Sequence, residues 1–504
     1  MIWNLIILSS INCKRVMINS KENILDNNKL DISLCMIVKN EEDNLKRCLD
    51  SVSNFIEEII IVDTGSSDDT INIAKKYGAT VIYYPWNDNF SDPRNESLKY
   101  ATKKWILVLD ADEEITKETG RGLAELSERE DVEAFNFNIL NYITAENYKL
   151  MNIHSNLKMF RNGRDYFYSG RVHELISPSI LKINKNANIE SSNLSILHYG
   201  YMVETRTKNL KSQRNIDLLH KELEDNPHDS FTNFNLGNSY YVLAKYKEAE
   251  KHFQESIKFS NIKMDFSALL FRNYCLCLVE LGKYQVALNF CDYAITFYED
   301  YPDLYFIRGE IFNVIGDLDQ AESNFLKCTY FKKELVKYVT MNEISGYVSY
   351  ERLMDILKRE GKVKEAIKYC SLMLEDNFSM DILITLYDLL RKIGYSVSQI
   401  VEYLNNNFKL TKEEIIKMLN IKGKEFENKK MYEKAFENYI KAVEINHEDK
   451  ANKVAAIKQV INIYKNFITN KIKEDKNNKV LNKKIFEIAT LAKSLDVYEA
   501  SERI

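Results

Sequence analysis

The chain contains 504 residues, of which 45% are hydrophobic and 28% are charged. This length and balance exclude a single small core and a disordered chain, and they predict about two to four globular domains. The net charge of −5 excludes a general nucleic-acid binder, because there is no excess of Lys and Arg to neutralise phosphates. Only 5 Pro and 15 Gly are present, which favours long helices over an all-β fold.

The first residues are apolar only over a short run, residues 2–8. A membrane span needs about 20 such residues, and no Lys or Arg precedes this run, so we expect neither a transmembrane span nor a signal peptide. Residues 1–30 are expected to form an N-terminal extension, with translation starting at Met17 as the alternative. The eight Cys have no zinc-ligand spacing, which favours buried free thiols in a cytoplasmic protein.

Residues 31–204 alternate short apolar runs with amphipathic segments. The apolar runs have the length of strands, and the segments between them repeat apolar residues at helical spacing. This alternation predicts an α/β domain of Rossmann-like type, with a mostly parallel sheet covered by helices on both faces. The predicted strands cover residues 32–38, 58–62, 80–84 and 105–109, and the predicted helices cover residues 42–52, 69–77 and 93–102.

Polar residues follow three of these strands directly. Lys39 and Asn40 follow the first strand, Asp63 follows the second and Asp110 follows the fourth. Open α/β sheets bind their ligands beyond the carboxyl ends of the strands. We therefore expect Val38, Asn40, Asp63 and Asp110 to line a ligand site.

Helical patterns with internal similarity dominate from residue 205 onward. Ala249, Ala287 and Ala321 lie 38 and 34 residues apart, close to the tetratricopeptide period of about 34. Gly282 and Gly316 suit the tight turns between paired helices. We expect a linker helix over residues 205–229, an all-α tetratricopeptide-repeat solenoid over residues 230–450 and further helices over residues 451–504. Such an array presents an extended surface for a peptide or protein, and it could also join copies of the chain.

Several segments of the first domain resemble the family 2 glycosyltransferases, whose fold is called GT-A. They are SLCMIVKNEE (33–42), VDTGSSD (62–68) and LDAD (109–112). The downstream strings KMFR (158–161), GRVHE (170–174) and HYGY (198–201), joined to tetratricopeptide repeats, are similar to the sublancin-type peptide S-glycosyltransferases. The resemblance implies a GT-A domain over residues 31–204 that takes a nucleotide sugar, with a UDP-sugar as the expected donor.

Asp110 and Asp112 carry the clearest chemical signal. Carboxylates directly after a buried strand suit a hard cation such as Mn2+ or Mg2+, which would stabilise the charge that develops on a diphosphate leaving group. Asp112 is the expected metal ligand, and strand capping is the alternative role for both residues. Arg94 lies near the start of a predicted helix, where a guanidinium can bind a phosphate or the base. A surface salt bridge is the alternative for Arg94.

The resemblance assigns the remaining roles. Asp63 is expected to contact uracil or ribose, although many relatives carry two aspartates where this chain has Asp63 and Thr64. Glu174 occupies the place of the carboxylate base that takes a proton from the acceptor. His198 resembles the histidine that completes the metal site, and imidazole is an acceptable ligand for Mn2+. The alternatives are Glu113 or Glu114 as the base and His173 as the metal ligand.

These features together predict an inverting glycosyltransferase with a peptide, protein or glycan acceptor. The alternative class is a scaffold in which the repeats bind a protein and the first domain is inactive. A sugar nucleotidyltransferase would need a Gly-rich basic loop after the first strand to hold a triphosphate. Residues 39–43 read KNEED instead, which has the wrong charge.

Overall fold

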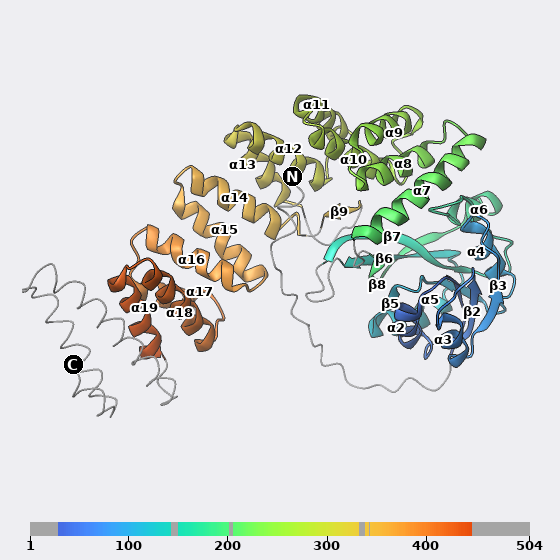
Figure 1. The fold of residues 1–504 in the computed structure, drawn as a ribbon, viewed down its shortest axis with the longest axis horizontal. Coiled ribbons are helices and arrows are strands. Elements are labelled where there is room, and N and C mark those ends of the chain that lie inside the picture. Colours follow the sequence, from blue (N-terminus) through green and yellow to red (C-terminus); the bar gives the residue numbers. More distant parts are fainter. Residues whose placement is uncertain (1–28, 143–149, 201–204, 332–337, 342, 446–504) are drawn as a thin grey trace, which may run out of the picture. The chain divides into compact units, whose positions relative to one another are not determined.

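The computed structural model describes residues 29–142, 150–200, 205–331, 338–341 and 343–445 (Figure 1). The predictions for the start of the chain, for Tyr201 and for helices over residues 451–504 lie outside these ranges. The chain divides into two compact units, Met1–Ser349 and Tyr350–Ile504. The first repeat helices therefore belong to the same compact unit as the α/β domain, although the sequence suggested a division after residue 204.

The strands and helices predicted for the first 110 residues are all present, within a few residues of their expected ends. The first four strands pair in parallel in the order β3-β2-β1-β4. The elements are β1 (Leu30–Val38), α2 (Glu42–Val52), β2 (Ile56–Asp63), α3 (Thr70–Lys76), β3 (Thr80–Tyr83), α4 (Ser91–Leu98) and β4 (Trp105–Val108).

The rest of the sheet is mixed, whereas the sequence suggested a mostly parallel sheet. Its elements are β5 (Glu113–Ile115), α5 (Lys117–Glu128), β6 (Ala134–Tyr142), β7 (Leu150–Arg161), α6 (Ser177–Ile183), β8 (Ile189–His198) and β9 (Thr340–Met341). β7 runs antiparallel to β4, β6 and β9, β5 runs antiparallel to β8, and β6 pairs in parallel with β8. Buried and half-buried residues alternate along most of β6, as in a strand with only one face in the core.

Helices cover both faces of the parallel part of the sheet. Leu34 and Met36 of β1 pack in a core with the buried residues of α2 and with Leu123 of α5. The intervening residue Cys35 faces the opposite core, which includes Ile106 of β4 and is covered by Leu98 of α4. Because both faces are buried, the strand is apolar at nearly every position.

The helix that the sequence assigned as a linker, α7 (Thr205–Asp225), packs against the α/β domain (Figure 1). Its residues Ile216, Leu218 and Leu219 form a buried cluster with Val172 of the α/β domain and Leu236 of the first repeat helix. The apolar residues of α7 are thus shared between the sheet domain and the repeats.

The described part of the repeat region is helical, apart from the short strand β9. The helices are α8 (Ser230–Val242), α9 (Tyr246–Phe259), α10 (Ser267–Glu280), α11 (Tyr284–Ile295), α12 (Pro302–Ile315), α13 (Leu318–Cys328), α14 (Tyr347–Arg359), α15 (Val363–Asp376), α16 (Met380–Lys392), α17 (Val397–Asn407), α18 (Lys412–Asn428) and α19 (Tyr432–Ile445). Gly316 ends α12 with φ of 88°, which confirms the expected tight turn. A Cβ built on Gly309 would lie 2.7 Å from the Phe325 ring, so α12 and α13 approach closely at this glycine.

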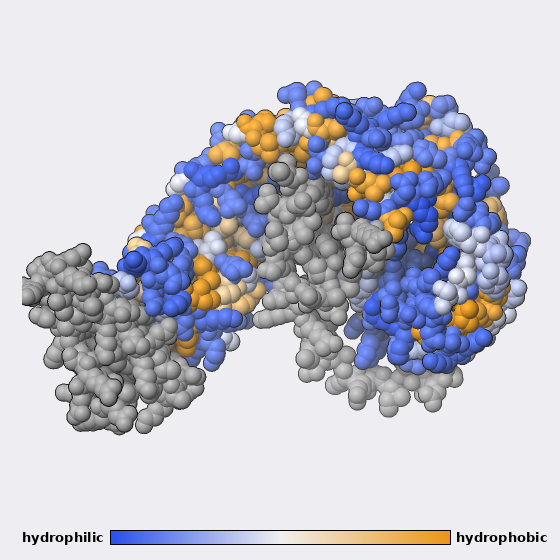
Figure 2. All heavy atoms as spheres, in the orientation of Figure 1, coloured by the Kyte–Doolittle hydropathy of each residue, from blue (hydrophilic) through white to orange (hydrophobic). Residues whose placement is uncertain are grey.

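The described cysteines are all free and buried, which agrees with the predicted buried thiols: Cys35, Cys48, Cys275, Cys277, Cys291, Cys328 and Cys370. On the face shown in Figure 2, apolar patches interrupt a mostly hydrophilic surface. Within the described part of the chain, none of the helices combines the length and apolar character that crossing a bilayer requires.

Candidate functional site

The carboxyl ends of β1, β2 and β4 lie side by side, as the sequence pattern predicted. Val38 is the register partner of Asp63, and Cys35 on the same strand pairs with Val108, two residues before Asp110. The parallel register therefore brings the segments that follow the three strands to one edge of the sheet. This edge is the candidate site.

Three of the expected nucleotide contacts make hydrogen bonds that hold the loops after β1 and β2. Both carboxylate oxygens of the buried Asp63 accept hydrogen bonds from the backbone N–H of Ser66 at 3.1 Å. Asn40 lies in the left-handed region with φ of 55°, and its side chain accepts from the backbone N–H of Ser67 at 2.8 Å. The backbone carbonyl of Val38 accepts from the N–H of Thr64 at 3.0 Å. These contacts join the loops after β1 and β2, and a nucleotide contact by Val38, Asn40 or Asp63 stays a prediction.

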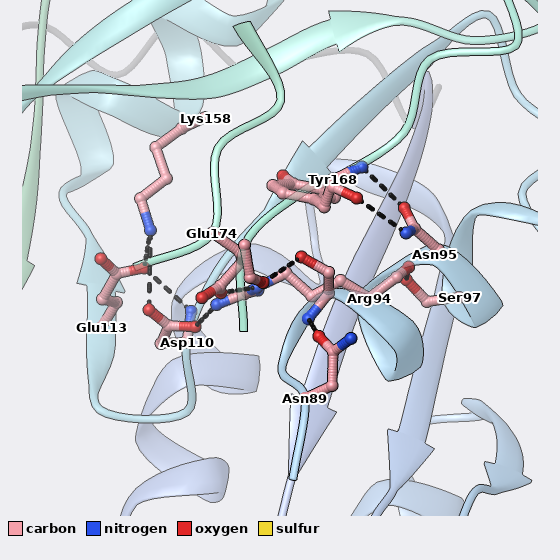
Figure 3. A network of polar contacts seen from close by, with 11 residues as sticks. Asn89, Arg94, Asn95, Ser97, Asp110, Glu113, Lys158, Tyr168 and Glu174 are labelled. Atoms are coloured by element: carbon pink, nitrogen blue, oxygen red, sulfur yellow. Dashed lines mark hydrogen bonds and ion pairs between the residues drawn. The ribbon is translucent and has the colours of Figure 1, made fainter. Parts of the chain in front are cut away.

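Arg94 connects two acidic residues that are far apart in the sequence (Figure 3). Its Nη2 lies 2.7 Å from Oδ1 of Asp110, and its Nε donates to Oε1 of Glu174. The Arg94 and Glu174 side chains are only 12% and 11% exposed, whereas Asp110 is 40% exposed. Arg94 thus forms salt bridges, as its alternative role predicts, but its own side chain is largely buried and not on the surface. A contact of Arg94 with a phosphate or the base stays a prediction.

The charges around Asp110 keep its carboxylate ionised. Burial alone would raise the pKa of Asp110, but Arg94 and Lys158 outweigh burial and hold it well below its usual value. Nη1 of Arg94 is buried and has no hydrogen-bond partner among the described residues. The site thus contains an ionised carboxylate and one unused guanidinium donor.

Lys158 is a site residue that the sequence analysis did not identify. Its ammonium lies 2.7 Å from Oε2 of Glu113, and both side chains are buried. The same carboxylate oxygen accepts from the backbone N–H of Asp110 at 2.9 Å, so this pair supports the Asp110 segment. Glu113 was an alternative base, but its buried pairing with Lys158 argues against that role. The KMFR string in β7 is the sequence signal that could have identified Lys158.

The second alternative base, Glu114, is also engaged. The Tyr199 hydroxyl donates to Glu114 at 2.9 Å, and the Arg47 guanidinium lies 4.2 Å from the centre of the Tyr199 ring. Of the three candidate bases, Glu174 is the one that shares Arg94 with Asp110 as an ion-pair partner. Its catalytic role stays a prediction.

The two expected metal ligands lie next to each other. Oδ2 of Asp112 is 3.6 Å from Nε2 of His198, because β5 and β8 pair with Glu113 opposite His198. Burial disfavours the charged ring, but Asp112 and other nearby carboxylates outweigh burial and raise the pKa of His198. The alternative ligand His173 interacts instead with the charges of Glu174 and Arg214.

A chain of polar contacts sets the proton position on His198. Burial, helped by the charges of Lys158 and His198, lowers the pKa of His154 to about 4, so this ring is neutral at pH 7. Nδ1 of His154 therefore accepts from the Asn141 amide at 2.9 Å. The Asn141 oxygen then accepts from Nδ1–H of His198 at 2.6 Å. In the neutral His198 ring, this contact leaves the Nε2 lone pair on the Asp112 side, as a metal ligand requires.

Gly200 leaves room beside these two ligands. A Cβ built on Gly200 would lie 2.5 Å from Nε2 of His198 and 2.6 Å from Oδ2 of Asp112. Such distances are closer than real Cβ contacts, so a side chain here would displace both ligand atoms. The glycine of the HYGY string keeps open the space that a cation would fill.

The donor set fits Mn2+ or Mg2+ bound together with a diphosphate. Carboxylate oxygen and imidazole nitrogen are both suitable ligands for Mn2+. The described residues contain no group of three or more His, Cys, Asp and Glu side chains that could hold a metal by themselves. Asp112 and His198 would therefore supply two ligands, and phosphate oxygens and water would supply the others, as is usual for Mg2+ at phosphate sites.

Comparison with known proteins identifies the families of the two kinds of domain. Residues 33–181 match the family model described as glycosyl transferase family 2, and residues 416–449 match that of the tetratricopeptide repeat. A TPR repeat-containing protein of Synechococcus elongatus is 34% identical over 231 residues, which are 45% of this chain and 56% of the relative. The SPbeta prophage-derived glycosyltransferase SunS of Bacillus subtilis is 30% identical over 290 residues, which are 56% of this chain and 66% of the relative.

A weaker similarity is found among solved structures. Glucosyl-3-phosphoglycerate synthase of Mycobacterium tuberculosis, in complex with Mn2+ and uridine-diphosphate-glucose, is 22% identical, with a TM-score of 0.20 over 22% of this chain and 43% of that chain. The chain spans less than two thirds of the length of the two curated relatives above. Residues 33–181 thus form a family 2 glycosyltransferase domain, which this chain joins to tetratricopeptide repeats.

Proposed function

We propose that this chain is an inverting glycosyltransferase that moves a sugar from a nucleotide sugar, with a UDP-sugar as the expected donor, to a side chain of a peptide or protein. The observation that carries the proposal is Arg94, which joins Asp110 to Glu174 at the sheet edge that also holds Asp112. A leaving group and an attacking group must meet at one carbon atom, so their binding residues must lie together.

The donor side of the site consists of Asp112, His198 and the ionised Asp110. A bound Mn2+ or Mg2+ would supply positive charge for the diphosphate as the sugar leaves it. Asn141 orients the His198 ring through Nδ1, and Gly200 keeps the adjacent space free. These residues prepare the site before the donor binds.

The acceptor side depends on Glu174. The acceptor oxygen or sulfur attacks the anomeric carbon, the bond from that carbon to the diphosphate breaks, and Glu174 takes the acceptor proton. Because attack and departure occur on opposite faces, the configuration of the sugar inverts. Glu174 is paired with Arg94, so one of its carboxylate oxygens is already engaged in an ion pair. A donor diphosphate is an anion that competes for Arg94, so donor binding would free Glu174 for its role.

The repeats are the expected acceptor site. Stacked helical repeats present an extended surface that suits a peptide or protein, and Cys, Ser and Thr are the side chains that one carboxylate base could serve. A glycan acceptor is the alternative within the same enzyme class. We place the reaction in the cytoplasm, where buried free thiols such as Cys35 and Cys48 stay reduced.

The test is to incubate the chain with Mn2+, a panel of UDP-sugars and candidate peptides. Release of UDP measures turnover, and the intact mass of each peptide shows whether it has received a sugar. We expect Asp112→Asn and Glu174→Gln each to lower kcat by at least about 100-fold. Glu130→Gln is the control, because this side chain is 84% exposed and pairs only loosely with Lys104 at 3.4 Å. If the wild-type chain turns over no nucleotide sugar with any divalent metal, the proposal is wrong and the chain is a binding scaffold.

A further inference from the structure

Helix α7 is firmly docked on the loops that carry the catalytic candidates. Nζ of Lys221 lies 2.6 Å from Asp88, in the loop that precedes α4. The Glu222 carboxylate accepts a hydrogen bond from the backbone N–H of Arg171, three residues before Glu174. These polar contacts flank the apolar cluster around Val172. The position of the Glu174 segment therefore depends on α7 as well as on the sheet.

This docking places two basic side chains of α7 beside the acidic edge of the sheet. The guanidinium of Arg214 lies 5.0 Å from the centre of the Phe90 ring and interacts electrostatically with Glu174. Lys211 stands three residues earlier on the same side of the helix, and its charge partly offsets the rise that burial causes in the pKa of Glu41. Both basic side chains are exposed to solvent. The same edge of the sheet also carries Asp110 and Asp112.

The acidic charge of the edge favours further cations beside the metal and Arg94. A diphosphate would meet the carboxylates of Glu41, Asp110, Asp112 and Glu174, which repel it. Of the nearby buried cations, Arg94 is held by two carboxylates and Lys158 by Glu113. The first half of α7, residues 205–216, contains four basic residues and no acidic residue: Arg206, Lys208, Lys211 and Arg214.

We propose that Lys211 and Arg214 bind the donor diphosphate, so that the helix leading into the repeats forms a wall of the donor site. This inference rests on the proposed function, because it takes a nucleotide diphosphate as the ligand. The supposed linker helix would then couple the repeats to the chemistry, since the same helix packs on α8 through Leu236.

The test is calorimetric titration of the full-length chain, in the presence of Mn2+, with UDP, UMP and uridine. We expect the double variant Lys211→Gln/Arg214→Gln to bind UDP at least about 10-fold more weakly, because it loses two charge-assisted contacts. The loss should be smaller for UMP and absent for uridine. Arg214→Lys should keep most of the affinity, and Lys251→Gln on α9, which removes an exposed charge elsewhere, should bind UDP as the wild type does.

The outcomes separate this inference from the proposed function. If the wild type binds UDP and the double variant binds it equally well, the inference is wrong and the proposed function stands. A loss of affinity that is equal for UDP, UMP and uridine also overturns the inference, because it would show that the two residues only support the fold. If the wild type binds none of UDP, GDP, dTDP and ADP, the proposed function itself fails. Thermal unfolding of each variant checks that the chain is folded.

Discussion

At the scale of single residues, the site depends on small residues and on residues that hold others in place. Asn141 and His154 are not themselves expected to contact the donor or the metal, yet together they fix which nitrogen of His198 carries the proton. Gly200 contributes only the absence of a side chain. Residues of this kind carry no chemical signature of their own, because an amide or a glycine is common throughout a protein.

We expect Gly200→Ala to weaken Mn2+ binding at least about 10-fold, since partners of metal ligands typically affect metal affinity by factors of about 10 to 100. The new methyl group would push apart Nε2 of His198 and Oδ2 of Asp112, which are the two expected ligand atoms. The measurement is Mn2+ titration followed by electron paramagnetic resonance. Uridine binding without metal is the internal control and should not change. Unaltered Mn2+ affinity would contradict the metal assignment to this pair.

At the scale of secondary-structure elements, the repeat turns show how one backbone requirement is met by different residues. Gly282, Gly316 and Gly361 have positive φ values between paired helices, as expected for tight turns. Ala244 and Lys430 occupy similar turns with φ of 56° and 59°. A side chain in this conformation costs free energy that glycine avoids.

Lys430→Gly is therefore expected to raise the free energy of unfolding of the second compact unit by about 0.5–1 kcal/mol. The turn joins α18 to α19, so the gain should appear in chemical denaturation of the repeats. Lys430→Ala is the matched control, because it removes the same charge but keeps a Cβ at φ of 59°. If Ala stabilises the chain as much as Gly does, the effect comes from the charge and not from the backbone.

A second element-scale prediction concerns pH and His252 of α9. Its Nδ1 lies 2.9 Å from the Asn233 oxygen, and its ring stacks on Tyr240. Burial, together with His220 and Lys251, lowers the pKa of His252 to about 4. An unfolded histidine has a pKa of about 6.5, so the unfolded chain binds the extra proton between about pH 6.5 and pH 4.

Stability should therefore fall as the pH is lowered through this window. His252 is expected to account for a loss of about 1–2 kcal/mol between pH 7 and pH 5. Chemical denaturation at both pH values measures it, and His252→Gln should show a smaller loss than the wild type. The exposed His228 supplies the control variant, His228→Gln, which should keep the wild-type pH dependence. An identical pH dependence in His252→Gln would show that the ring titrates normally in the folded chain.

At the scale of the whole molecule, the sequence predicted the features that depend on neighbouring residues in the chain, such as strands, helices and the residues at their ends. The apolar run Ile32–Val38 indicates a strand because both of its faces are buried. Open α/β sheets bind ligands beyond the carboxyl ends of their strands, and this rule placed Asp63 and Asp110 at one edge of the sheet. Contacts that depend on long-range pairing were not predicted. Asn141 meets His154 and His198 only because β6 pairs with both β7 and β8.

The position of α7 belongs to the same class of long-range features. Its apolar residues at helical spacing predict a buried face, but they do not say whether the sheet domain or the repeats cover it. In the structure, Ile216 and Leu219 share one buried cluster with Val172 of the sheet domain and Leu236 of the repeats. The division after residue 204 was drawn from a change in pattern, whereas compactness depends on which surfaces bury one another.

The division of the chain at Ser349 leads to a prediction about truncation. A chain ending at residue 346 keeps α7 and the repeat helices up to α13, and it should bind UDP with Kd within about 3-fold of that of the full-length chain. A chain ending at residue 204 lacks α7. Loss of this helix exposes Val172 and Phe90 and removes Lys211 and Arg214. This shorter chain should therefore bind UDP at least about 10-fold more weakly than the full-length chain does.

The longer truncation also tests where the acceptor binds. If repeats beyond residue 346 hold the peptide, this chain should bind UDP but transfer sugar to the peptide far more slowly than the full-length chain does, and kcat/KM for the peptide measures the difference. Binding of UDP by the 204-residue chain at full strength would contradict a role for α7 in the donor site. Undiminished transfer by the 346-residue chain would instead place the acceptor on the repeats of the first unit, α8 to α13.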